Sequence, residues 1–310
     1  MKASWERLRT TYFGHLIRAM VRVAYRVREW ILINLNPKPF LTWSAEKLQE
    51  WKKERYLNPI IKSERVLLHK AREKYESQYT FPEENPLVSV MIPTWNRCEI
   101  LMERTLPSIF NQTYKNYEVV VVGDCCTDNT EKLVKSIYDP RIRFLNLSKR
   151  GSYPKGKEAF WQVAGGVPVN KALELCRGKW IAPLDDDDVF TPDHIEILLH
   201  HAQKHNLEFV YGKLKVEAEP GIWKEKGFAN KHMSMQNSTT MFRSYIKLFR
   251  ADINCWRIGM TGDYQRTVRC REAGVQIGYL NKVVSIMPLR PGQTRMGLIA
   301  EDRSYNKITG

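Results

Sequence analysis

The sequence predicts an α/β fold, in which a mostly parallel sheet carries helices on both faces. From residue 86 onward, short apolar segments typical of buried strands alternate with segments of helical character. Polar residues directly follow several of the apolar segments. With 310 residues, the chain has room for one large domain and an accessory segment. We expect a basic helical extension over residues 1–80, the sheet domain over residues 86–295 and a tail over residues 296–310.

The composition restricts the class of protein. No run of roughly 18 apolar residues is present, so no membrane-spanning helix is expected. The N-terminal apolar residues are interrupted by arginines, unlike a signal peptide, and the six cysteines lack zinc-site or C-x-x-C spacing. These features favour a cytoplasmic protein with reduced thiols. The net charge of +15 favours anionic partners, such as phosphates, nucleic acid or a membrane surface.

Much of the positive charge lies in the first 80 residues, which hold 17 Lys and Arg against 8 Asp and Glu. Within residues 9–33, apolar side chains recur at three- and four-residue steps opposite a row of arginines, which predicts a basic amphipathic helix. Such a helix could make the protein peripheral on an anionic membrane surface, or pack on the sheet domain or another subunit. A second helix is expected over residues 44–79, and both could mediate oligomerisation. No nucleic-acid-reading module is recognisable, so nucleic acid is not the expected partner.

The elements of the sheet domain are expected in a regular order. Pro93 ends the first apolar run, and Asp128 is expected to open a helix because Glu131 follows three residues later, as in a capping box. Thr191 and Pro192 have the residue types of an N-cap and a first helical position. The expected strands are 87–92, 117–122, 141–147, 179–184 and 209–215, and the expected helices are 99–111, the one from Asp128, 167–176 and 191–205.

Three polar clusters are expected to share one edge of the sheet. Residues 93–96, Gly123-Asp124 and the four consecutive aspartates 185–188 each follow an expected strand. In open α/β sheets, ligands bind beyond the carboxyl ends of the strands. Adjacent carboxylates repel one another, so they either spread into water or converge on a cation. Because these four follow a strand, we favour a site for Mg²⁺ or Mn²⁺, which nucleotide phosphates often share.

Three segments resemble the successive blocks of the family-2 glycosyltransferases. They are VSVMIPTWNR at 88–97, VVVVGDCCTDNT at 119–130 and WIAPLDDDD at 180–188. The resemblance covers roughly residues 86–295 and implies a GT-A fold, a nucleotide-sugar donor, a divalent cation and usually inversion at the anomeric carbon. The implied acceptor is a glycan, a lipid-linked glycan or another hydroxyl compound.

The resemblance also implies roles for single residues. In the acidic loop, Asp185 and Asp187 match the ends of the D-x-D element: Asp187 would bind the metal, and Asp185 the metal, the ribose or the sugar. Asp188 would support them, and Asp186 would face solvent. The nucleotide pocket would be lined by Pro93, Thr94, Asn96 and Asp124, the last facing the nucleobase.

A further carboxylate is expected to act on the acceptor hydroxyl, which must lose a proton as it attacks. Asp263 lies in a segment that resembles the family's acidic segment, where the general base resides. Without the resemblance, Asp263 would be interpreted as a helix N-terminal residue favoured by the helix dipole. Asn237 stands where members often have histidine, and no histidine follows Asp263, so no third metal ligand is evident. His232 could supply one, although a surface histidine is the simpler interpretation.

Two further segments are expected near the ligands. The basic segment 148–157, with its Gly and Pro residues, could contact donor phosphates or an anionic acceptor, or remain a solvated loop. Residues 289–295 resemble the family's mobile segment that folds over the donor. Arg290 and Arg295 are therefore expected to pair with the diphosphate, since guanidinium binds phosphate in a bidentate manner.

Two alternative functions are compatible with the sequence. A noncatalytic nucleotide-sugar-binding or scaffold protein could have the same fold, but it would not need to retain Asp124, Asp185, Asp187 and Asp263 together. The other is a retaining transferase or a nucleotidyltransferase on a related fold. The retained carboxylates favour a metal-dependent, inverting glycosyltransferase.

Overall fold

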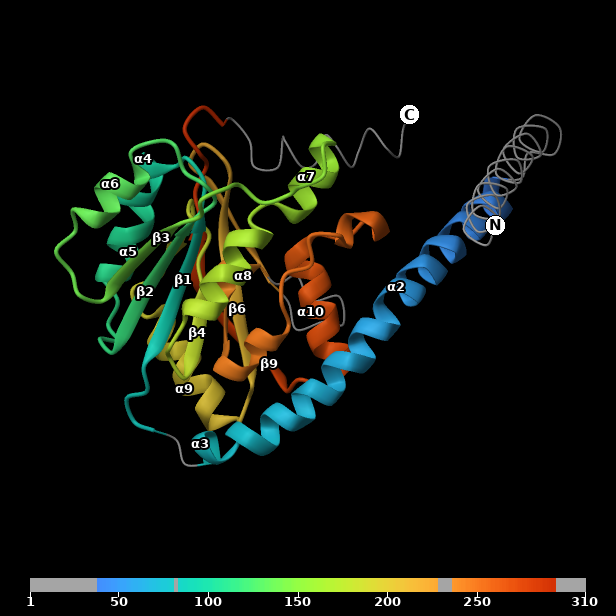
Figure 1. Cartoon of the computed structure of the whole chain (residues 1–310), viewed down its shortest axis with the longest axis horizontal. Helices are drawn as coiled ribbons and strands as arrows, with labels where there is room; N and C mark the ends of the chain where they lie inside the picture. The colour runs from blue at the N-terminus through green and yellow to red at the C-terminus, as the bar shows by residue number, and fades with distance from the viewer. Residues whose placement is uncertain (1–37, 81–82, 228–235, 294–310) are drawn as a thin grey trace, which may run out of the picture. The chain divides into compact units, whose positions relative to one another are not determined.

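The computed structural model describes residues 38–80, 83–227 and 236–293 (Figure 1). The chain divides into two compact units, Met1–Tyr56 and Leu57–Gly310. Helix α2 (Lys38–Tyr75) confirms the second expected helix, and a short helix α3 (Ser77–Thr80) follows it. The basic helix expected over residues 9–33 lies outside the described residues. None of the described helices has the length and apolar character needed to cross a bilayer.

Four parallel strands form one half of the sheet, in the order β3-β2-β1-β4. Every residue of β2 (Tyr117–Gly123) is buried, and β1 (Val88–Thr94) is buried except at Pro93. Strands covered on both faces are mainly apolar, which is why these runs stand out in the sequence. The other two strands are β3 (Ile142–Asn146) and β4 (Trp180–Pro183).

The other half of the sheet is mixed. Strand β8 (Thr240–Arg243) runs antiparallel to both β4 and β6 (Phe209–Glu219), and β9 (Ile277–Met287) runs parallel to β6. The two-residue strand β5 (Val189–Phe190) pairs antiparallel with β9, and β7 (Ile222–Lys226) forms an exposed hairpin with β6. The predicted α/β class is confirmed, although β5, β7, β8 and β9 were not predicted.

Helices pack on both faces of the sheet (Figure 1). In β1, Val88, Val90 and Ile92 point to the face covered by α5 and α9, whereas Met91 points to the face covered by α8 and α10, as alternation along a strand requires. The helices of the sheet domain are α4 (Cys98–Ile100), a π-helical turn (Leu101–Thr105), α5 (Leu106–Phe110), α6 (Thr130–Lys135), α7 (Lys157–Val163), α8 (Gly166–Leu175), α9 (His194–Lys204) and α10 (Gly262–Ala273). Short 3₁₀ turns span Asn237–Thr239, Ser244–Leu248 and Cys255–Ile258.

The predicted start of helix α9 is wrong by a few residues. The helix begins at His194, with Asp193 in the N-cap position, rather than after Thr191. Both the amide and the hydroxyl of Thr191 donate to the carbonyl of Val284 in β9, at 3.1 Å each. These bonds keep residue 191 beside the sheet, so the helix can begin only beyond it.

The predicted capping box at α6 is also wrong. Helix α6 begins at Thr130, and Glu131 pairs with Lys135 one turn later instead of reaching back. Asp128 accepts hydrogen bonds from the amides of Thr130 and Cys98, at 3.1 Å each. Its carboxylate therefore ties the start of α4 to the start of α6.

Candidate functional site

The polar segments that follow β1, β2 and β4 meet at one edge of the sheet, as predicted. The amide of Asp124 donates to the carbonyl of Thr94 at 2.8 Å, and the amide of Trp95 donates to Asp186 Oδ2 at 3.4 Å. Strand β1 lies between β2 and β4, so its carboxyl end is adjacent to both loops. Parallel pairing thus gathers segments about 90 residues apart into one site.

Asp124 is buried at this edge and is held by the segment 148–157. Its carboxylate accepts hydrogen bonds from the amide of Gly151 at 3.1 Å and from the hydroxyl of Tyr153 at 2.8 Å. Burial, followed by the adjacent Asp124 carboxylate, raises the pKa of the Tyr153 phenol. Arg150 of the same segment lies over the indole of Trp95, with 3.3 Å between the guanidinium carbon and the ring centroid. The segment therefore packs on the carboxylate that was expected to face a nucleobase.

The other residues expected at the nucleotide pocket also lie at this edge. Pro93 and Thr94 are the last residues of β1, and Asn96 follows in the left-handed region with φ of 50°, which asparagine tolerates better than most residues. The Asn96 side chain donates to Thr127 Oγ1 at 3.1 Å and accepts from the Thr127 amide at 2.8 Å. Asn96 therefore ties the loop after β1 to the loop after β2.

Asp186 does not face solvent, contrary to the prediction. The acidic loop turns on a hydrogen bond from the amide of Asp188 to the carbonyl of Asp185, at 3.1 Å. This turn directs Asp186 back toward β1, where only 7% of the residue is exposed. Arg97 Nη1 donates to Asp186 Oδ1 at 2.7 Å, and Thr105 Oγ1 donates to the Asp186 carbonyl at 2.9 Å. Asp186 therefore anchors the loop to the segment after β1.

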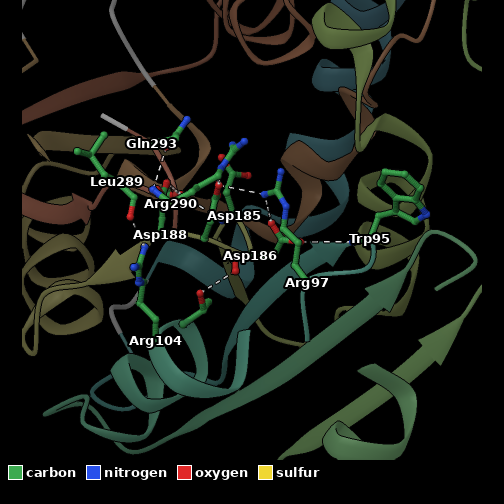
Figure 2. Close-up of polar contacts among 12 residues, drawn as sticks. Trp95, Arg97, Arg104, Asp185, Asp186, Asp188, Leu289, Arg290 and Gln293 are labelled. Carbon is green, nitrogen blue, oxygen red and sulfur yellow. Dashed lines mark hydrogen bonds and ion pairs between the residues drawn. The ribbon is translucent and has the colours of Figure 1, made fainter. Parts of the chain in front are cut away.

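Two arginines share one oxygen of Asp187. Arg97 Nη1 lies 3.0 Å from Asp187 Oδ2, and Arg290 Nε donates to the same atom. Figure 2 shows Arg97 and Arg290 directed toward the acidic loop. Asp187 is 9% exposed, whereas both guanidinium side chains are partly exposed, so each ion pair has one buried and one solvent-accessible partner. Arg290, which was expected to pair with the donor diphosphate, thus contacts a carboxylate of the acidic loop.

The surroundings of Asp188 and Asp185 disfavour the charged forms of these two carboxyls. Asp188 is fully buried; Ser238 donates to its Oδ2, and its Oδ1 has no partner among the described residues. Burial, then the charges of Asp185 and Asp187, raise the pKa of Asp188 well above its usual range. Burial, then the charges of Asp187 and other neighbours, raise the pKa of Asp185 to about 7, against a hydrogen bond from Asn237. Asn237, which replaces the family's frequent histidine, thus contacts the acidic loop.

The acidic loop fits a divalent cation by its chemistry. Across residues 38–80, 83–227 and 236–293, no three His, Cys, Asp or Glu side chains are arranged around a common metal position. The raised pKa values show that burial and neighbouring carboxylates disfavour the charged forms of Asp185 and Asp188, which a nearby cation would favour, and Asp188 Oδ1 is a buried acceptor without a donor among the described residues. Hard divalent ions bind such oxygens. His232 and Arg295 lie outside the described residues.

Asp263 approaches the acidic loop from a separate part of the chain. It lies in the first turn of α10, and its Oδ1 accepts a hydrogen bond from the Tyr264 amide at 2.8 Å. Its negative charge contributes to the raised pKa of Asp185, which lies 78 residues earlier in the chain. A pocket beside Asp263 is lined by Phe209, Gln236, Asn237, Thr240, Arg266 and Thr267.

Sequence reasoning missed several residues of the site. Arg97 directly follows the polar cluster after β1. Because four clustered aspartates require nearby cations, this arginine could have been predicted as their partner. Tyr153 stands in the segment 148–157, which was expected at the site without a partner. Ser238 gave no signal, because its bond to Asp188 depends on the packing of a 3₁₀ turn against the acidic loop.

Comparisons with known proteins identify the family of this chain. The profile of the family described as "Glycosyl transferase family 2" matches residues 89–254. Over 125 residues the chain is 32% identical to the "Putative colanic acid biosynthesis glycosyl transferase WcaA" of Escherichia coli K12, covering 39% of this chain and 40% of that protein. Over 130 residues it is 33% identical to the "UDP-Glc:alpha-D-GlcNAc-diphosphoundecaprenol beta-1,3-glucosyltransferase WfgD" of Escherichia coli, covering 42% and 46%. The chain thus spans less than half the length of these relatives.

A solved structure shares the fold. The Staphylococcus aureus TarS 1–349 complex with UDP-GlcNAc matches with a TM-score of 0.52 and 20% identity, covering 67% of this chain and 60% of that chain. This similarity supports the GT-A assignment of the mixed sheet and its helices. Because the family profile covers more than half of the 310 residues, the chain belongs to glycosyl transferase family 2.

Proposed function

We propose that this protein transfers a sugar from a nucleotide-sugar donor to a hydroxyl group of an acceptor in polysaccharide biosynthesis, with inversion at the anomeric carbon. The observation that carries the proposal is that Asp263 in α10 lines a pocket together with Asn237, the residue that hydrogen-bonds Asp185 in the acidic loop. A carboxylate on one side can then act on the acceptor, while the loop on the other side receives the donor. Family membership supports the nucleotide-sugar chemistry.

In the proposed reaction, Asp263 is the general base. The acceptor oxygen attacks the anomeric carbon, Asp263 takes the hydroxyl proton, and the nucleoside diphosphate leaves with the electrons of the broken bond. The hydrogen bond from the Tyr264 amide holds the Asp263 carboxylate in place. A single displacement of this kind inverts the anomeric carbon.

The donor would lie along the edge formed by the loops after β1, β2 and β4. Asp124 is buried and accepts from a tyrosine hydroxyl and an amide, so an N–H group of a nucleobase could take the place of either donor. Pro93, Thr94 and Asn96 would form the adjoining wall. Arg290, and Arg295 beyond the described residues, would pair with the diphosphate.

The metal would be held by Asp185 and Asp187. When bound, a Mn²⁺ or Mg²⁺ ion would neutralise part of the charge that develops on the leaving diphosphate. Arg97 and Asp186 would keep the loop in position, because their ion pair at 2.7 Å joins the loop to the segment after β1.

We propose a glycan or lipid-linked glycan as the acceptor. The name of the relative WfgD includes a diphosphoundecaprenol acceptor, and residues 9–33 have the pattern of a basic helix suited to an anionic membrane surface. Deleting residues 1–40 should abolish binding to vesicles that contain anionic lipid. Unchanged vesicle binding would show that this segment is not the membrane contact.

The donor can be tested by thermal shift. The protein is heated with UDP-, GDP- and dTDP-sugars in the presence of Mn²⁺, and the true donor should raise the unfolding temperature because it binds the folded state. With a suitable acceptor, chromatography should then detect release of a nucleoside diphosphate, and NMR should detect an inverted product. Binding without turnover would support the noncatalytic alternative. Pyrophosphate release would support a nucleotidyltransferase, and a retained anomeric configuration would refute single displacement.

A further inference from the structure

The two arginines on Asp187 are not equivalent. Arg97 has a second carboxylate partner, Asp186, and its side chain is 32% exposed. Arg290 is paired with Asp187, and its side chain is 42% exposed. Breaking the Arg290 pair leaves Asp187 with one guanidinium, whereas moving Arg97 would leave the buried Asp186 unpaired. Arg290 is therefore the guanidinium that can leave at lower cost.

The backbone at Arg290 is held independently of its side chain (Figure 2). The Leu289 amide donates to Glu217 Oε2 at 2.9 Å, and Arg104 Nη1 donates to the Leu289 carbonyl at 3.1 Å. The Arg290 amide donates to Gln293 Oε1 at 2.9 Å. The guanidinium can therefore change partners by side-chain rotation, without movement of the main chain.

Two guanidiniums already share Asp187 Oδ2, so a divalent cation bound to the same carboxylate would be repelled by both. A donor diphosphate would bring phosphate oxygens that a guanidinium binds in a bidentate manner. We propose that Arg290 exchanges partners: it holds Asp187 in the donor-free protein and moves to the donor's diphosphate when a metal takes that carboxylate, while Arg97 stays on Asp186. This inference rests on the proposed function, and it makes Arg290 a positioning residue that couples metal binding to donor binding.

The exchange predicts that removing Arg290 strengthens metal binding. In Arg290→Ala, the Mn²⁺ affinity of the nucleotide-free, full-length protein should rise about fivefold, which is about 1 kcal/mol, as expected for a half-exposed ion pair that no longer competes. Electron paramagnetic resonance of free Mn²⁺ measures this directly. Arg250→Ala is the matched control, since Arg250 pairs with Glu174 at 2.7 Å with side chains 50% and 44% exposed. It removes the same charge and should leave Mn²⁺ affinity unchanged.

The second arm adds UDP, GDP or dTDP. In the wild-type protein, the nucleoside diphosphate that binds should raise Mn²⁺ affinity, and by linkage Mn²⁺ should raise nucleotide affinity by the same factor. This coupling should be smaller in Arg290→Ala, because the variant lacks the guanidinium that would move from Asp187 to the diphosphate. General damage to the site would weaken Mn²⁺ binding, which is the opposite sign.

Each outcome decides a different point. Unchanged or weaker Mn²⁺ binding by Arg290→Ala, with wild-type nucleotide binding, would overturn the exchange and leave the proposed function intact. An equal gain of Mn²⁺ affinity in Arg250→Ala would mean that the change in net charge causes the effect, and it would also overturn the exchange. If none of the three nucleotides binds either protein, the proposed function fails, whereas the first arm still decides whether Arg290 competes with the metal for Asp187.

Discussion

His194, the first residue of α9, should make the stability of this protein depend on pH. Its ring is fully buried and stacks on Phe190, with 3.5 Å between the ring centroids. Nδ1 lies 2.7 Å from the Val284 carbonyl and so carries the proton, whereas the buried Nε2 has no partner among the described residues. Protonating Nε2 would place a charge in an apolar site. Burial accordingly lowers the pKa of His194 from 6.5 to about 3.

The direction of the effect follows from this shift. Below pH 6.5, His194 of the unfolded chain binds a proton, whereas His194 of the folded protein stays neutral down to about pH 3. The contribution of His194 to stability is therefore complete above pH 6.5 and is lost as the pH falls toward 3. A pH of about 5 lies about 1.5 pH units below the unfolded-state pKa, so the unfolding free energy is lower there by about 2 kcal/mol.

His194→Asn isolates this contribution. The asparagine amide can replace Nδ1 as the donor to Val284 but does not titrate. Urea unfolding, followed by tryptophan fluorescence, should show that wild type loses about 2 kcal/mol more than the variant between about pH 7 and about pH 5. Other titrating groups cancel in this difference. His69→Asn, at a histidine whose side chain is 76% exposed, should retain the wild-type pH dependence. Equal losses in wild type and His194→Asn would refute the reasoning.

Three substitutions test the site. Asp263→Asn should lower kcat by roughly 10²- to 10⁴-fold in a nucleoside diphosphate release assay, with donor Kd nearly unchanged, because it removes only the proton acceptor. Arg97→Ala should lower the urea unfolding free energy by about 3 kcal/mol, since it leaves the buried Asp186 carboxylate without its cation. Ser238→Ala should cost about 1 to 3 kcal/mol in the same assay, because it removes the hydroxyl that donates to fully buried Asp188.

Each of these expectations can fail in a specific way. Turnover like that of wild type in Asp263→Asn would exclude Asp263 as the base. An unfolding curve like that of wild type for Arg97→Ala would mean that water or another group satisfies Asp186. An unfolding curve like that of wild type for Ser238→Ala would mean that the Ser238 hydroxyl does not stabilise the buried Asp188.

The sequence by itself determined the α/β class and the edge of the sheet that carries the polar clusters. β1, β2 and β4 are mainly apolar because both of their faces are buried, and the polar clusters follow where the strands end. Parallel pairing then requires the three strand ends to lie side by side, so Thr94, Asp124 and the acidic loop could be grouped before any contact was known. These properties depend on local composition and on a general rule of sheet geometry.

Only the tertiary structure decided what each carboxylate contacts. Asp186 was expected in solvent but is buried on Arg97, and Asp187 is shared with Arg290, 103 residues away. Adjacent aspartates are alike in a sequence, and they differ only because the turn of the loop directs each side chain toward a different neighbour. The start of α9 was misplaced for the same reason, since the bonds of Thr191 to β9 are long-range. Local patterns record which residues are buried, whereas the pairing of charges depends on segments that only folding brings together.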